Sequence, residues 1–166
     1  MDQAASPDQL AALAAALEAS WLGVAMRDST VLYPLVNIMH LLGLVLIVGG
    51  LGLLDLRLLG AARHVRLVDL YTPLTAAAAL GLGLQVATGV PLFASEATAL
   101  IGNNAFRLKM LLFALTLANA VLFRLLWGRR VLDWDSAPPF IGLVQAALSL
   151  MLWVTIGALG RLIAYV

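Results

Sequence analysis

Four long apolar stretches decide what this chain can fold into. Three of them carry no formal charge, counting histidine as neutral: residues 31–54, 70–94 and 140–160. In the fourth, only residues 110–123 are free of charge, and the stretch reaches full length if Arg107, Lys109 and Arg124 extend towards the membrane surfaces. A helix needs about 20 mainly apolar residues to cross a bilayer. We therefore expect four spanning helices, over about residues 31–60, 69–94, 105–127 and 139–162.

The composition indicates an integral membrane protein. Of the 166 residues 63% are hydrophobic and 11% are charged, and the mean hydropathy is +1.00. Such a chain is too apolar for an ordinary soluble domain. It has no basic block that could follow a phosphate backbone, so we expect no nucleic-acid partner. The absence of cysteine excludes disulfides, thiolate zinc sites, iron–sulfur clusters and covalently attached haem. The expected fold is an all-α integral membrane four-helix bundle.

A shorter amphipathic segment precedes the four spans, so we divide the chain into residues 1–28 and 29–166. The first part is too short and too polar on one side to span a membrane. Its large apolar residues recur on one helical face: Leu10, Leu13, Leu17 and Trp21. We expect an N-terminal amphipathic interfacial helix or a helix folded over the end of the bundle, with this face used mainly for packing; lipid sensing is the alternative.

The cationic residues favour one orientation in the membrane. The connections after the first and third spans carry six Lys or Arg residues, whereas the opposite side carries four. Cytoplasmic loops hold an excess of these residues. The distribution predicts that both termini lie outside the cytoplasm.

His40 is an ionisable side chain inside the first span. It lies about ten residues from the expected outer end of the helix, or about 15 Å at 1.5 Å per residue. Ionisable residues inside a membrane commonly mark a functional site, because burying one without a partner is costly. Three interpretations are open: an axial ligand to b-type haem, a structural imidazole bonded to Gln85, Thr88 or a backbone carbonyl, and copper or proton handling.

The helical face of His40 is shared by Val36, Asn37, Gly43 and Ile47, of which Asn37 and Gly43 are candidate site residues. Asn37 can hydrogen-bond to an imidazole nitrogen or to a ligand. Gly43 leaves room for a flat macrocycle or for a second helix, and close helix contact is the commoner use of glycine in membranes. Both residues are candidate parts of a cofactor site.

Other candidates come from the remaining spans. Gln85 and Met151 fall at the depth of the histidine, and Met151 is a candidate second haem ligand or a metal ligand. Arg107, Lys109 and Arg161 lie nearer the outer surface, where they can pair with haem propionates. Lys109 can also meet a quinone oxygen or a lipid phosphate, or extend to the interface without a ligand.

The histidine count limits the haem hypothesis. The other histidine, His64, lies in an arginine-rich connection on the opposite side. A haem would thus be five-coordinate, ligated by histidine with methionine or lysine, or shared between protomers. The copper alternative would use Met39, His40 and Met151.

Asp55 and Arg57 come at the other end of the first span. Two residues apart, they do not share a helical face. We expect Asp55 to pair with Arg124 or Arg129, which the antiparallel topology places at the same side; proton uptake is the alternative. The other polar residues inside the spans are expected to form interhelical hydrogen bonds: Thr88, Asn119, Gln145 and Ser149. No pattern indicates a hydrolase or a transferase.

Four segments carry a resemblance to a known family: "HLLGLVLIVGGLGLLDLRLLG", "TGVPLF", "NNAFRLKM" and "GALGRLIAY". They resemble a family of small bacterial inner-membrane proteins of unknown function that have four predicted helices. The resemblance implies a bacterial inner-membrane location and gives these matching positions: His40, Asp55, Arg57, Thr88, Gly89, Asn104, Phe106 and Lys109. More distantly, the histidine-then-glycine opening resembles copper-resistance D-type and cytochrome b561-type proteins, which implies copper or haem. The single membrane histidine departs from the two-haem pattern of the b561 type.

The leading hypothesis is a b-type haem membrane protein in electron transfer or redox sensing. Its expected partners are membrane lipids, a redox partner or quinone, and further copies of itself, because the glycine-rich helix faces offer packing surface. The main alternative is a cofactor-free membrane scaffold or accessory subunit.

Overall fold

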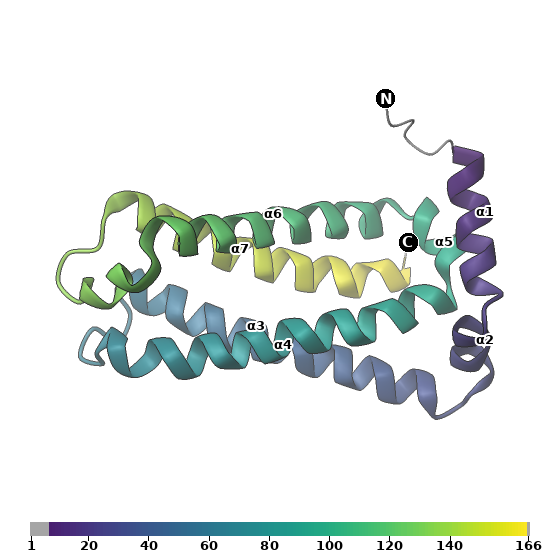
Figure 1. Ribbon diagram of the computed structural model, residues 1–166, viewed down its shortest axis with the longest axis horizontal. Coiled ribbons are helices and arrows are strands. Elements are labelled where there is room, and N and C mark those ends of the chain that lie inside the picture. The colour runs from purple at the N-terminus through teal and green to yellow at the C-terminus, as the bar shows by residue number, and fades with distance from the viewer. Residues whose placement is uncertain (1–6, 166) are drawn as a thin grey trace.

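The computed structural model describes residues 7–165 as helices joined by short connections (Figure 1). Four long helices lie side by side: α3 (Leu32–Leu58), α4 (Leu67–Ser95), α6 (Asn104–Trp127) and α7 (Phe140–Leu162). By length and hydropathy each can cross a bilayer. The expectation of an all-α membrane bundle is confirmed, and the described part of the chain contains no strand.

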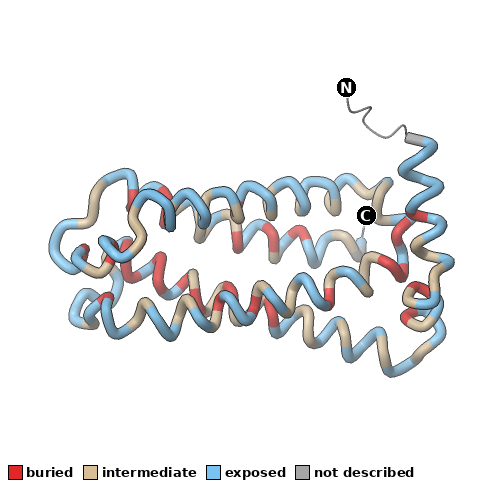
Figure 2. The backbone as a smooth tube through the Cα atoms, viewed as in Figure 1, coloured by how far each residue is buried: buried red, intermediate tan, exposed pale blue. Residues whose placement is uncertain are grey.

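The four helices pack unequally. Helix α3 packs against both α4 and α7, and α6 packs mainly on α7. In the most apolar part of the third span only 6% of the residues are buried, against 28% in the fourth span. Buried residues line the facing sides of the helices, and the outer sides are exposed (Figure 2). Apolar side chains on these outer sides are suited to lipid contact.

Helices α3 and α4 meet along a seam of small residues, which we call the glycine seam: Gly43, Gly50, Ala78 and Gly81. A Cβ placed on Gly81 would lie 2.7 Å from the carbonyl oxygen of Gly43. A Cβ on Gly50 would lie 2.5 Å from the carbonyl oxygen of Leu74. The two backbones therefore approach so closely that the seam needs glycine, as is usual for close helix contacts in membranes.

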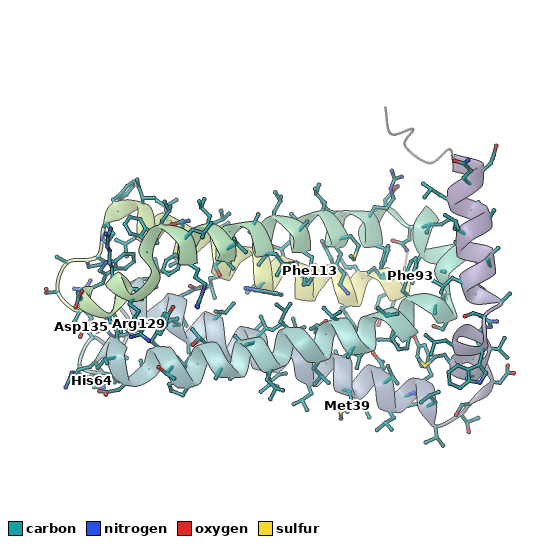
Figure 3. All side chains as sticks on the ribbon, viewed as in Figure 1. Met39, His64, Phe93, Phe113, Arg129 and Asp135 are labelled. Carbon is teal, nitrogen blue, oxygen red and sulfur yellow. The ribbon has the colours of Figure 1, made fainter. Side chains whose placement is uncertain are left out.

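Aromatic and branched side chains fill the space between the helix pairs. The rings of Phe113 and Trp153 meet edge to face with centroids 6.2 Å apart, beside the buried Ile47. Phe93 of α4 stacks on Phe106 of α6 at 5.5 Å, nearer the end where α4 finishes (Figure 3). Contact between α4 and α6 thus depends on long side chains, whereas α3 and α4 touch through their backbones.

An ion pair between the buried Arg57 and the exposed Asp135, the Arg57–Asp135 clamp, closes the loop end of the bundle. The Arg57 side chain is 4% exposed, and its Nη2 lies 2.7 Å from Asp135 Oδ1. Its Nε donates to the carbonyl oxygen of Val65 at 2.7 Å, and the backbone N–H of Leu67 donates to the same Asp135 oxygen at 3.0 Å. The clamp joins the end of α3, the start of α4 and the segment after the short helix η1 (Gly128–Asp133).

The expected ion pair from Asp55 to Arg124 or Arg129 is not formed. Asp55 points into the bundle and hydrogen-bonds to Ser149 of α7, while Arg124 and Arg129 are exposed. The physical reason is geometric: the carboxyl group lies on the buried face of α3, and a guanidinium reaching it would have to leave water.

Helices α1 (Pro7–Glu18) and α2 (Trp21–Asp28) lie across the other end of the bundle (Figure 1). The expected single N-terminal helix is instead two helices with a 60° bend between them. Ser20 begins the second helix, since its hydroxyl accepts a hydrogen bond from the N–H of Gly23. Residues 1–6 of the expected helix lie outside the described residues.

The expected packing face of this N-terminal segment points outward. Leu10, Leu13 and Trp21 are exposed, with Trp21 at 83%, and Leu17 is half-buried; the buried residues are Ala14, Gly23 and Met26. Large apolar groups on the outside of a membrane protein are suited to the lipid interface. Helices α1 and α2, which we call the cap, thus bury Ala14, Gly23 and Met26 and expose most of their large apolar residues.

Candidate functional site

His40 of α3 is held by Thr88 of α4. The imidazole Nδ1 lies 2.9 Å from the Thr88 hydroxyl oxygen, and that hydroxyl donates to the carbonyl oxygen of Leu84 at 2.5 Å. A hydroxyl group has one hydrogen, so Thr88 accepts from His40, and Nδ1 is the protonated nitrogen. In a neutral imidazole the lone pair is then on the other ring nitrogen, Nε2.

Two more residues of α4 complete this contact. Gln85 Nε2 donates to the backbone carbonyl oxygen of His40 at 2.8 Å. Gly89 faces the ring, since a Cβ placed there would lie 3.4 Å from His40 Cε1. The side chain of Gln85 thus contacts the histidine as expected, but at its backbone carbonyl oxygen. The orientation of the imidazole ring is set by Thr88.

Lys109 of α6 is half-buried and lies within electrostatic range of His40. The ammonium group lies beside Gly160, where a Cβ would be 3.6 Å from Nζ. Among the described residues Lys109 has no carboxylate partner, so its charge is available to an anionic ligand. Charge–charge interactions at such a site are strong because the surrounding dielectric constant is low.

Two of the expected neighbours on α3 lie elsewhere. Gly43 is buried against Gly81 and Gln85, so α4 occupies the space that a macrocycle would need there. Asn37 is exposed on the outside of the helix. Neither contributes a side chain to the His40 site.

The structure shows the expected methionine and arginine partners on outer faces or in other contacts. Met151 is 68% exposed on the outer face of α7. Met39 points away from α6 and α7 (Figure 3). Arg107 is exposed, and Arg161 lies over the Tyr165 ring at 4.9 Å and hydrogen-bonds to its hydroxyl. Of the expected cofactor residues, Gln85 contacts His40 directly, and Lys109 lies within electrostatic range of it.

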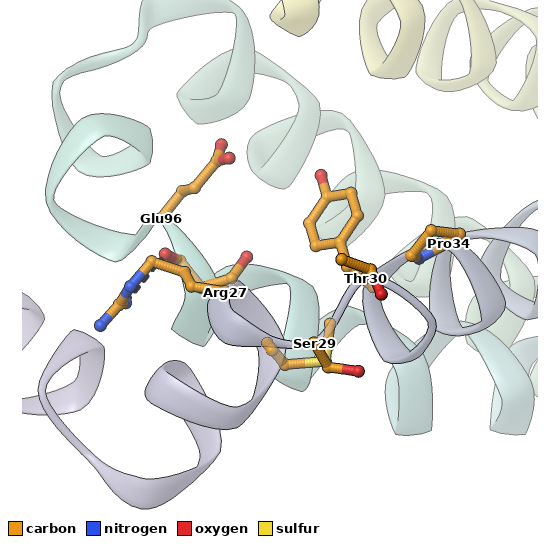
Figure 4. A pocket seen from close by; sticks show the side chains of 8 residues that line it. Arg27, Ser29, Thr30, Pro34 and Glu96 are labelled. Atoms are coloured by element: carbon orange, nitrogen blue, oxygen red, sulfur yellow. Dashed lines mark hydrogen bonds between the residues drawn. The ribbon is translucent and has the colours of Figure 1, made fainter.

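A hollow of about 490 Å³ lies where the cap meets the bundle (Figure 4). Its lining includes Arg27, Tyr33 and Glu96, and Arg27 and Glu96 point away from each other. Arg27 Nη1 donates to the carbonyl oxygen of Ser95 at 3.1 Å. Sequence reasoning missed this hollow, because it exists only where α2 folds back onto the end of α4.

Polar side chains join α6 and α7, as expected. Trp127 Nε1 donates to Gln145 Oε1 at 2.7 Å, and Asn119 donates to the backbone carbonyl oxygen of Gln145 at 3.2 Å. These bonds satisfy polar groups that lipid cannot. They serve helix association, and no catalytic arrangement surrounds them.

The fold and the site together define a helical membrane protein with one histidine site among its spanning helices. In the part of the chain that the structure describes, no group of three or more His, Asp or Glu side chains is placed to hold a metal ion. No family model matches the chain, and neither a curated protein nor a solved structure matches it. The resemblance to small bacterial inner-membrane proteins therefore stays a prediction.

Proposed function

We propose that this protein binds one b-type haem through His40 and acts in electron transfer or redox sensing. The observation that carries the proposal is the hydrogen bond from His40 Nδ1 to Thr88, because it leaves Nε2 free to bind iron. A hydrogen bond on the second ring nitrogen also orients a ligating histidine and raises its basicity. When bound, the haem would supply one-electron redox chemistry.

Lys109 supports the same proposal. A cation inside a spanning helix is costly unless it meets a counter-charge. A propionate would provide that counter-charge, since charge-assisted hydrogen bonds to carboxylates are strong. Lys109 would therefore fix one edge of the haem, while His40 holds its centre.

Neither Met151 nor His64 is placed to be a second axial ligand within one chain. Met151 faces outward, and His64 is exposed in the loop at the opposite end of the bundle from the cap (Figure 3). The haem would be five-coordinate or shared with a second copy of the chain. The low burial of α6 and the open surface beside Gly83 supply packing surface for such an oligomer. A quinone or a redox partner would exchange the electron.

A second candidate function is a cofactor-free scaffold or accessory subunit. The same Thr88 contact favours it, because a hydrogen-bonded imidazole also serves as an interhelical link. In either case we propose a bacterial inner-membrane location with both termini on the periplasmic side, from the distribution of Lys and Arg.

An optical spectrum of the protein purified from haem-replete cells tests the proposal. We expect a Soret band that is lost in His40→Ala and kept in His64→Ala, whose side chain is exposed in a loop. A folded, colourless wild-type preparation would contradict haem binding and favour the accessory role. A band that survives in His40→Ala would assign the haem to another ligand.

A further inference from the structure

Asp55 is a buried carboxyl group that the haem proposal does not use. It lies in the last turn of α3 and is 7% exposed. Its Oδ2 is buried without a hydrogen-bond partner, and its polar contact is the hydroxyl of Ser149. One turn before Ser149, the buried Nε2 of Gln145 also lacks a partner. This part of the interior therefore holds polar atoms with unused hydrogen-bonding capacity.

The charged and titratable groups nearby do not neutralise Asp55. Arg57, two residues further on α3, is engaged by Asp135, and Arg124 of α6 is exposed. Helix α4 contributes the half-buried Tyr71 to the apolar cluster at this end. The polar residues of helix α7 at this place, Ser149 and Gln145, are both uncharged.

A bare carboxylate at this position is unfavourable for two independent reasons. An ionised group inside a membrane bundle needs a counter-ion or a hydrogen-bonding shell, because hydrocarbon supplies neither. The last turn of a helix also carries the negative end of the helix dipole, which disfavours an anion. Both effects favour the neutral acid over the anion.

We infer that Asp55 is an exchangeable proton-binding site at the loop end of the bundle. The carboxylate takes a proton from a hydronium ion in the water on that side: an O–H bond of the hydronium breaks and leaves water, an O–H bond forms at the carboxyl oxygen, and the negative charge is lost. The Arg57–Asp135 clamp lies over this end, so it is the structural element next to the path of exchange.

This inference does not depend on haem. Residues 40 and 55 are separated along α3 by about 22 Å at 1.5 Å per residue. A failed haem test would leave the Asp55 test unaffected, and the reverse also holds.

Infrared spectroscopy of the full-length protein in lipid nanodiscs tests the inference. At pH 7 we expect the carbonyl band of a protonated carboxylic acid, which shifts in deuterated water. The band should be lost in Asp55→Asn and kept in Asp69→Asn, an exposed aspartate in the first turn of α4. In Ser149→Ala the band should move, because the hydrogen bond to the carboxyl group is removed.

Four results would overturn the inference. A wild-type spectrum without the band means that Asp55 is ionised. A band that persists in Asp55→Asn belongs to another carboxyl group, and one that does not shift in deuterated water marks a proton that does not exchange. Loss of the wild-type band on adding sodium chloride, but not choline chloride, would assign the site to a sodium ion instead.

Discussion

At the scale of single residues, the hydroxyl of Thr88 determines what His40 can do. It accepts from Nδ1 and donates to Leu84, so the ring presents Nε2 as its free nitrogen. The sequence named Thr88 and Gln85 as possible partners of the histidine. The structure shows that Thr88 contacts the imidazole ring and that Gln85 contacts the backbone carbonyl oxygen of His40. The sequence position of a residue predicts how deep it lies in the membrane. It does not predict which way the residue faces, because the rotation of each helix about its axis depends on packing.

Replacing Thr88 by valine should lower the stability of the bundle by about 1 kcal/mol, because Nδ1–H loses its acceptor. The matched control is Thr155→Val. Thr155 is exposed on α7, and its hydroxyl donates within its own helix to the carbonyl oxygen of Met151. Denaturant unfolding in mixed micelles measures both variants. Equal losses would show that the His40 contact adds nothing beyond the intrahelical bond.

At the scale of elements, hydropathy was enough to predict the four long helices. A spanning helix satisfies its own backbone, so length and apolar composition define it without knowledge of its neighbours. The bend at Ser20 was missed, although a serine before an apolar run is a helix-start signal, because the same residues also fit one continuous amphipathic helix. Which glycines form contacts was also not predictable, since Gly81 and Gly83 look alike in the sequence.

The glycine seam predicts that these two positions respond differently to alanine. Gly81→Ala should cost about 1–3 kcal/mol, because the new methyl group meets the Gly43 carbonyl oxygen and helix α3 must move. Gly83→Ala should be neutral, or slightly stabilising through the better helix propensity of alanine, because nothing lies within 4 Å of its Cβ position. Thermal unfolding in detergent checks both. A destabilised Gly83→Ala would indicate that this surface is covered by a second copy of the chain.

At the scale of the whole molecule, contacts between distant segments close the two ends of the bundle. The clamp joins Arg57 to Asp135, and the cap is fastened by Glu18 to Thr98 in the first turn of α5 (Ala97–Gly102). Neither partner could be read from the sequence. Charge patterns identify residues that need a partner, but the choice among several exposed charges depends on how the loops fold. The expected pairing of Asp55 failed for another reason, because its carboxyl group lies on the buried face of α3.

The attachment of the cap should depend on pH. The Thr98 side chain and backbone N–H both donate to Glu18, and with the nearby Arg27 they hold the pKa of this carboxyl below its ordinary value of 4.5. A lowered pKa means that the ionised form is favoured when the cap is docked. The stabilisation is therefore complete above 4.5 and is lost as the pH falls through the lower pKa of the docked state.

Spin labels measure this release directly, because the chain has no cysteine of its own. With labels at Ala11→Cys and Ala99→Cys, two exposed positions on α1 and α5, the distance between them should increase on acidification. In Glu18→Gln the distance should no longer depend on pH, because the titrating group is gone. In Glu96→Gln, a neighbouring exposed carboxyl, the wild-type response should remain. An unchanged pH response in Glu18→Gln would mean that another group controls the docking of the cap, and the hydrogen bonds to Thr98 would then have only a local role.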